Sequence, residues 1–168
     1  MSISAVDDVL LAAATLLATV DPDPSPAPIA AWAYPANYDD ITFDDLPVIV
    51  VSEVVNQRRN WEIKSAGLGL HRWEMEILVF LAEGQLTSHA AAAPIERLQT
   101  PWYKALADKL YGRMTLGVEG TWIGKGDGGS FRLMEPYHVG HISFDTRTFW
   151  GIRAIVPINQ KHSQTMAA

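Results

Sequence analysis

The feature that most constrains the fold is a long segment, from Trp61 to Leu81, in which apolar and polar residues alternate. The two alternating sets are Trp73, Met75, Ile77, Val79 and Leu81 on one side, and Arg72, Glu74 and Glu76 on the other. Because successive side chains of a strand point to opposite faces, this pattern indicates a strand with one covered face. Gly67 and Gly69 indicate a bend, so we expect either a long bent strand or a hairpin arm.

Other segments also have strand character. IAAWAY predicts a short strand, and VIVVSEVV, which follows Pro47, is continuously apolar and β-branched. Such a run is typical of a central strand that is covered on both faces. HVGHISFD and FWGIRAIVPI alternate, and the short connection from Asp145 to Thr148 predicts a hairpin between them.

Two segments have helical periodicity. In the first, about residues 4–20, apolar residues recur every three or four positions, and Ser4 with Asp7 can form a capping box. In the second, about residues 101–115, Thr100 and Pro101 are a suitable cap and first turn. The order helix, strands, helix, strands predicts an α+β fold, with a mainly antiparallel sheet of about four to five strands packed against two principal helices.

The 168 residues, of which 48% are hydrophobic and 19% charged, predict one globular domain over residues 1–168. Within it we expect a stiff, extended polyproline spacer at residues 21–28, because alternating prolines remove backbone donors. We also expect flexible loops at residues 86–99 and 117–130, and a mobile polar tail at residues 159–168.

The net charge of −6 disfavours a dedicated nucleic-acid binder, since a phosphate backbone requires clustered cations. The absence of cysteine excludes disulfides and thiolate metal sites. The apolar run near the N-terminus is preceded by Asp7 and Asp8 rather than by Lys or Arg, and it is shorter than a membrane span. We therefore expect this run to be part of a folded cytoplasmic protein.

The stretch GTWIGKGDGGSF is the strongest candidate for a ligand site. Gly124, Gly126 and Gly129 have the spacing of a dinucleotide-binding motif, but that motif must lead into a helix N-terminus. Here Pro136 and strand-like alternation follow, and no Ser or Thr comes after Lys125 as in an ATPase phosphate loop. We interpret the stretch as an exposed loop, and keep a small phosphate- or nucleotide-binding enzyme as an alternative.

Other candidate chemistry is weaker. The aspartates at 39, 40, 44 and 45 lack the spacing of a calcium loop, and His138 and His141 fall on opposite faces of a strand. No nucleophile elbow occurs. The sequence therefore predicts no catalytic, metal or cofactor site.

The order of these features resembles the tail terminator family of long-tailed bacteriophages. The resemblance covers about residues 3–158, and it lies in the segments SAVDDVLLAAATLLATV, DDLPVIVVSEV, NQRRNWEI, HRWEMEILVFLAEG, TPWYKALADKLYGRM and TFWGIRAIVPI. It implies a structural virion protein of the tail or neck, assembled in the host cytoplasm, and not an enzyme. Such a protein forms a ring, typically a hexamer, that caps the tail tube, stops its polymerisation and provides the head-tail joining surface.

The implied partners are further copies of the chain, the tail tube protein and a head-closure or neck protein. DNA would only pass through the channel, with no specific nucleic-acid binding, and no membrane is involved. The spacer and the two long loops exceed what a minimal member needs, so another neck protein, for head closure or tail completion, is an alternative. We predict a protein interface at Arg58, Arg59 and Trp61 and, in the glycine-rich stretch, at Lys125 and Asp127.

Overall fold

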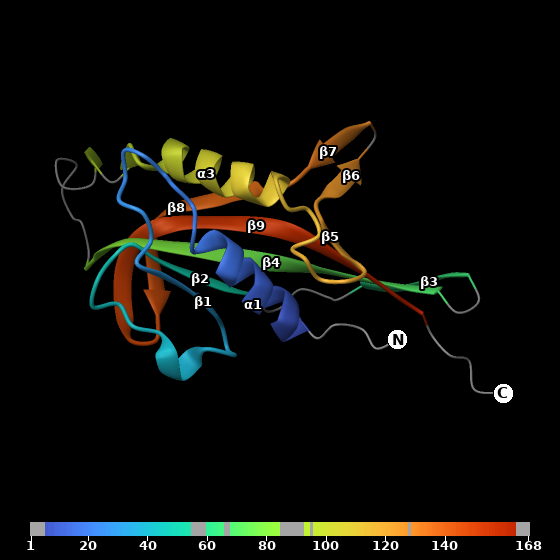
Figure 1. Cartoon of the computed structure of the whole chain (residues 1–168). Helices are drawn as coiled ribbons and strands as arrows, with labels where there is room; N and C mark the ends of the chain where they lie inside the picture. The colour runs from blue at the N-terminus through green and yellow to red at the C-terminus, as the bar shows by residue number, and fades with distance from the viewer. Residues whose placement is uncertain are drawn as a thin grey trace.

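The computed structural model describes residues 6–54, 60–65, 68–84, 93–94, 96–127 and 129–163. Its elements, shown in Figure 1, are α1 (Val6–Leu17), β1 (Ala30–Ala33), the short 3-10 helix η1 (Tyr38–Asp40), β2 (Val48–Glu53), β3 (Asn60–Ser65), β4 (Leu68–Glu83), α3 (Gln99–Tyr111), β5 (Thr121–Ile123), β6 (Lys125–Asp127), β7 (Ser130–Arg132), β8 (Glu135–Phe144) and β9 (Arg147–Ser163).

The fold is α+β, as predicted, but the sheet is larger than expected. Seven strands form one sheet with the order β1-β2-β4-β9-β5, in which β3 also pairs with β4 and β8 with β9. The prediction of four to five strands is wrong because β4 and β9 are long enough to pair with two successive strands along one side. The sheet is mixed, since β1 runs parallel to β2 while the other pairs are antiparallel.

Helix α1 buries one face against the sheet, and its buried residues are Val9, Leu10, Ala13, Ala14 and Leu17. These residues share a core with Ile49 and Val51 of β2 and with the apolar set of β4. The predicted helix at residues 4–20 is therefore present, although it ends at Leu17, and Ser4 lies outside the described residues.

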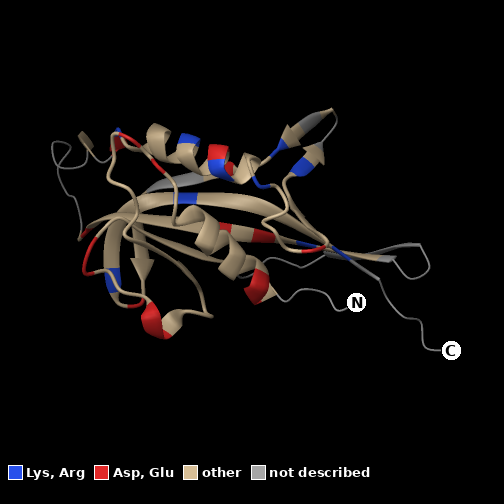
Figure 2. Cartoon of the chain, in the orientation of Figure 1, with Lys and Arg blue, Asp and Glu red and all other residues tan. Residues whose placement is uncertain are grey.

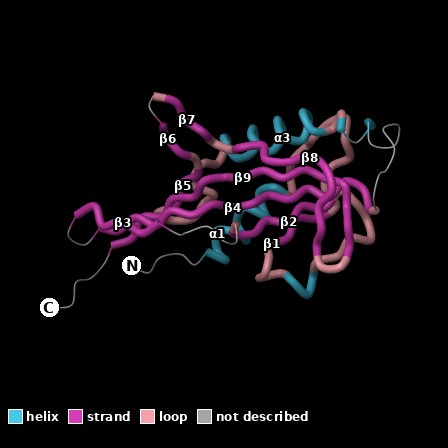
Figure 3. The backbone as a smooth tube through the Cα atoms, turned by 180° about the vertical axis from the view of Figure 1, so that it is seen from behind, coloured by secondary structure: helices cyan, strands magenta, loops and turns pink. Residues whose placement is uncertain are grey.

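Helix α3 covers the same face of the sheet, and Trp102, Leu106 and Leu110 are its buried residues. The predicted boundaries of 101–115 are shifted, because the helix spans Gln99–Tyr111. Thr100 is not the cap: Leu98 occupies the N-cap and makes no side-chain capping bond. Figure 3, seen from behind, shows the opposite face of the sheet, where neither α1 nor α3 lies.

A second, smaller core lies on that opposite face at one end of the sheet. Phe80 and Phe149 contact each other there with ring centroids 5.0 Å apart, and Phe43 packs on both. Phe43 belongs to the segment between η1 and β2, so this polar segment contributes a buried aromatic side chain as well as Asp44 and Asp45. Strand β2 is buried on both faces over Val48–Val51 and has a neighbour on each side, as predicted.

The proline-rich segment is not fully extended, and the prediction of a straight polyproline spacer at residues 21–28 is wrong. The Ser25 amide donates to the Pro22 carbonyl over 2.8 Å, which closes a turn, and the Asp23–Pro24 peptide is cis. The turn brings Ser25 into the interior, where its hydroxyl accepts a hydrogen bond from Trp102. Tertiary packing thus overrides the local preference of proline for an extended chain.

Two segments predicted to be irregular are strands. Residues 159–163 continue β9 and pair with β4, so the predicted mobile tail does not begin at residue 159. Residues 117–130 are a loop only in part, because β5, β6 and the start of β7 lie within them. Most of the predicted loop at 86–99 lies outside the described residues, and Gln99 already belongs to α3.

For the segment from Trp61 to Leu81 the sequence leaves two alternatives, a long bent strand or a hairpin arm, and the structure shows the hairpin arm. β3 pairs antiparallel with the first part of β4, and the helix-facing set of β4 agrees with the predicted alternation. Neither α1 nor α3, the helices of the described residues, is long and apolar enough to cross a membrane.

Candidate functional site

Three of the five predicted interface residues are described, and they lie in two separate projecting elements. Trp61 lies in β3, while Lys125 and Asp127 lie in β6. Arg58 and Arg59 lie outside the described residues. Figure 1 shows β3 and the β6–β7 hairpin at the same end of the molecule, beyond the part of the sheet that α1 and α3 cover.

The strand register relates these two elements. Trp61 is opposite His71, His71 is opposite Gln160, and Gln160 is opposite Thr121. Three strand spacings of about 4.8 Å therefore separate β3 from β5, a distance of roughly 14 Å. The two predicted interface segments, which are distant in the sequence, therefore lie on the two sides of one β-sheet arm.

Two glycines of the GTWIGKGDGGSF stretch have a structural role. Gly120 has a φ of +72°, and a Cβ there would come within 2.8 Å of the Lys161 carbonyl oxygen. Gly124 has a φ of +97°, and a Cβ there would overlap the ring of Phe131. The stretch continues into β7 and then β8, so it does not lead into the helix N-terminus that a dinucleotide motif requires.

The base of the β6–β7 hairpin is fixed to the sheet by hydrogen bonds. The Gly124 amide donates to the Pro157 carbonyl over 2.8 Å. The side-chain amide of Asn159 donates to the Gly124 carbonyl over 2.8 Å and to the Trp122 carbonyl over 3.3 Å. The hairpin therefore leaves the sheet in a defined direction.

Beyond this base, the hairpin exposes an aromatic side chain and two cations. Phe131 is 51% exposed, and the side chain of Lys125 is also exposed. Arg132 makes an ion pair of 3.2 Å with Glu135. Figure 2 shows the basic residues of the hairpin, and it shows acidic residues at the start of α1 and in η1.

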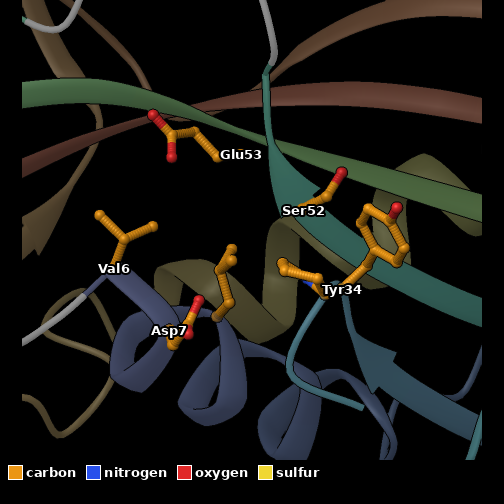
Figure 4. Close-up of a pocket in the computed structure, with 7 residues that line it drawn as sticks. Val6, Asp7, Tyr34, Ser52 and Glu53 are labelled. Carbon is orange, nitrogen blue, oxygen red and sulfur yellow. The ribbon is translucent and has the colours of Figure 1, made fainter. Parts of the chain in front are cut away.

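A groove at the other edge of the sheet was not predicted from the sequence. It has a volume of about 420 Å³ and is lined by the first turns of α1 and by the ends of β1 and β2. Its apolar wall consists of Val6, Leu10, Tyr34 and Pro35, and its carboxylates are Asp7 and Glu53. Figure 4 shows that Asp7 comes from α1 and Glu53 from β2. Only tertiary structure brings these three segments together.

The acidic segment and the histidines of β8 contain the side-chain types that bind metal ions. Among the described residues, no group of three or more His, Asp or Glu side chains has the arrangement of a metal site. Tyr38 donates to the Asp145 carboxylate over 3.1 Å, and this hydrogen bond raises the pKa of Tyr38. His141 is exposed and packs edge-on against Trp150 at 4.7 Å, while the side chain of His138 lies outside the described residues.

Comparison of the chain with models of known protein families and with curated proteins finds no match.

The structure shows which of several tryptophans are buried in the core and which are partly exposed, a distinction that the sequence does not provide. Trp102 and Trp73 are buried in the core, and both donate to buried side-chain acceptors. Trp122 is half-buried, and the Lys161 ammonium lies 5.3 Å from its ring centroid. The side chain of Trp61, the predicted interface anchor, is not among those described.

Proposed function

We propose that this chain is a structural subunit of a ring that caps the tail tube of a long-tailed bacteriophage. The proposal rests above all on the β-sheet arm, which projects beyond the part of the sheet that α1 and α3 cover. β4 and β9, of 16 and 17 residues, continue past the helix-covered core, where β4 pairs with β9 on one side and with β3 on the other, and the β6–β7 hairpin stands beside them. A ring subunit needs such projecting elements because it must reach its neighbours on both sides.

The mechanism that we propose is steric. A ring docked on the last ring of the tube covers the surface that the next tube subunit would use, so polymerisation stops. The free side of the ring then presents the joining surface for a neck protein. Ring contacts are heterologous, so each subunit uses two different patches and the angle between them determines closure, here proposed as a hexamer.

The charge of the chain is compatible with a DNA channel. A net charge of −6 favours a wall along which a phosphate backbone slides without binding. We propose no catalytic role and no cofactor, because the backbone geometry already explains the glycines at 120 and 124.

Deletion of the coding sequence from the phage that encodes it tests this proposal. We expect tails of irregular, excessive length that fail to join filled heads, with both defects corrected when the intact chain is supplied in trans. Tails of normal length that lack heads would instead indicate the alternative, a head-closure or tail-completion protein. Normal tails joined to heads would contradict both functions.

A second measurement examines the chain alone. Negative-stain microscopy of the concentrated protein is expected to show rings with a central hole. Mixing the protein with purified tail tubes provides the natural template, and we expect the rings to sit at tube ends. Binding along the sides of tubes, with the ends free, would contradict capping.

A further inference from the structure

The β6–β7 hairpin has the properties of an element that docks on another molecule. It is a two-stranded sheet separate from the main one, with strands of three residues each. Isolated hairpins of this size are marginally stable in water. This hairpin nevertheless exposes half of the Phe131 side chain and the Lys125 ammonium, so its surface is suited to an apolar and acidic partner site.

The groove at the start of α1 has the complementary properties. Leu10 and Tyr34 contribute to its apolar wall, and the carboxylates of Asp7 and Glu53 line it. Its volume of about 420 Å³ leaves room for a large side chain. A partner with an aromatic group and a neighbouring cation therefore fits it better than a purely apolar or an acidic one.

The two elements lie on opposite edges of the sheet. The groove adjoins β1 at one edge, and the hairpin follows β5 at the other. Four strand spacings of about 4.8 Å separate these edges by roughly 19 Å. The hairpin also points away from the β1 edge, so it does not reach the groove of its own chain (Figure 1).

We propose that the β6–β7 hairpin of one copy docks in the α1 groove of the next, with Phe131 against the apolar wall and Lys125 paired with Asp7. This head-to-tail contact uses two different patches, which is the arrangement that produces a closed ring when the rotation closes. The inference rests on the proposed ring and names its intersubunit contact.

The charged residues of the hairpin favour the pairing of Lys125 with Asp7 of the next copy. Arg132 is already paired with Glu135, so Lys125 is the cation assigned to the partner. The same strand also contains the acidic residue Asp127. The hairpin therefore depends on one correctly placed ion pair rather than on a general attraction between a basic element and an acidic groove. Because every copy carries a net charge of −6, a specific cation–carboxylate contact is needed to offset repulsion between copies.

A charge swap tests the contact. We expect Lys125→Glu and Asp7→Lys each to raise the dissociation constant of the oligomer by about tenfold or more, because each variant places like charges together. The double variant should restore assembly, since it reverses the pair. Sedimentation velocity over a concentration series gives the dissociation constants. Lys104→Glu and Asp40→Lys are matched controls, because these exposed residues belong neither to the hairpin nor to the lining of the groove.

Cross-linking tests the same contact without relying on its strength. The chain has no cysteine, so Lys125→Cys and Asp7→Cys introduce unique thiols. A short bismaleimide should join the two single-cysteine proteins into dimers when they are mixed. It should also convert the doubly substituted protein into a ladder of higher oligomers. The pair Lys104→Cys with Asp7→Cys is the control and should give neither product.

Phe131 is tested in the same way. Phe131→Ala should weaken assembly, while Tyr111→Ala, which removes an aromatic side chain that is 71% exposed on α3, should not. Circular dichroism and thermal melting show whether each variant is folded.

Different results overturn the inference and the proposed function. Rings that form with unchanged affinity in Lys125→Glu and Asp7→Lys, or an absence of cross-linked ladders, would overturn the hairpin-to-groove contact while leaving the ring proposal intact. A chain that remains monomeric and uncross-linked at its highest soluble concentration would also overturn the contact. Normal tail length and head joining after deletion would overturn the ring function itself.

Discussion

The indole Nε1 of Trp102 donates a hydrogen bond of 2.9 Å to the hydroxyl of Ser25, and both side chains are buried. This bond joins α3 to the proline-rich segment, 77 residues earlier in the chain. It explains why that segment turns inward instead of running straight across the surface.

Replacement of Ser25 by Ala should destabilise the fold. The Trp102 N–H would lose its acceptor in a buried site, which costs about 1–3 kcal/mol of unfolding free energy. Urea unfolding measures this loss. Ser143→Ala, at an exposed position, is the control and should change stability by no more than about 0.5 kcal/mol.

The same bond predicts non-additivity. In a Trp102→Phe background the indole N–H is already absent, so Ser25→Ala should cost less than it does in the intact chain. Equal costs in the two backgrounds would show that the hydrogen bond does not stabilise the fold.

Gly124 and Gly126 should respond differently to substitution. Gly124→Ala places a Cβ at a φ of +97° and against the Phe131 ring. The unfavourable backbone alone costs about 1–2 kcal/mol. Gly126→Ala meets no atom within 4 Å and requires no positive φ, so it should be nearly neutral. Thermal melting of the two variants compares them, and similar losses would contradict this account of the glycine-rich stretch.

Leu10 and Leu11 provide a matched pair on α1. Leu10 is 1% exposed and packs in the main core, whereas Leu11 is 38% exposed. Leu10→Ala should therefore lower the unfolding free energy by about 2–5 kcal/mol. Leu11→Ala should have a much smaller effect, and denaturant unfolding distinguishes the two. A larger loss for Leu11 would mean that the helix presents a different face to the sheet.

Tyr103 should make stability depend on alkaline pH. Burial raises its pKa from the ordinary value of 10.0 to about 12, and its hydroxyl donates to the Arg153 carbonyl. Between pH 10 and 12 the unfolded chain has released this proton while the folded chain retains it, so stability falls as pH rises. Tyr103→Phe should make this fall less steep in unfolding experiments over that range. An identical pH dependence in the variant would contradict the assignment.

Local patterns in the sequence are sufficient to predict the main helices and strands. The period-two alternation of β4 and the helical spacing of α1 depend on neighbours within one turn or one pleat, so the covered faces could be predicted without tertiary information. The burial of β2 on both faces followed in the same way from its continuous β-branched run.

The sequence also indicated where the candidate surfaces are, but not how they are built. The sequence predicts that Lys125 lies in an exposed connection, but it does not indicate the hairpin, because glycine in a strand lowers the local strand signal. The groove was not predicted, since Asp7 and Glu53 each have an ordinary local explanation on their own elements.

The burial of polar residues, by contrast, depends on contacts between distant segments. Gln160 lies in a polar tail by composition, but its side-chain oxygen accepts a hydrogen bond of 2.8 Å from the Trp73 indole. Ser25 is buried in the same manner by Trp102. Burial of a polar group is costly unless a partner is present, and here the partners are 87 and 77 residues away. Local periodicity carries no information over such separations, so the extent of β9 and the path of the proline-rich segment depend on tertiary contacts.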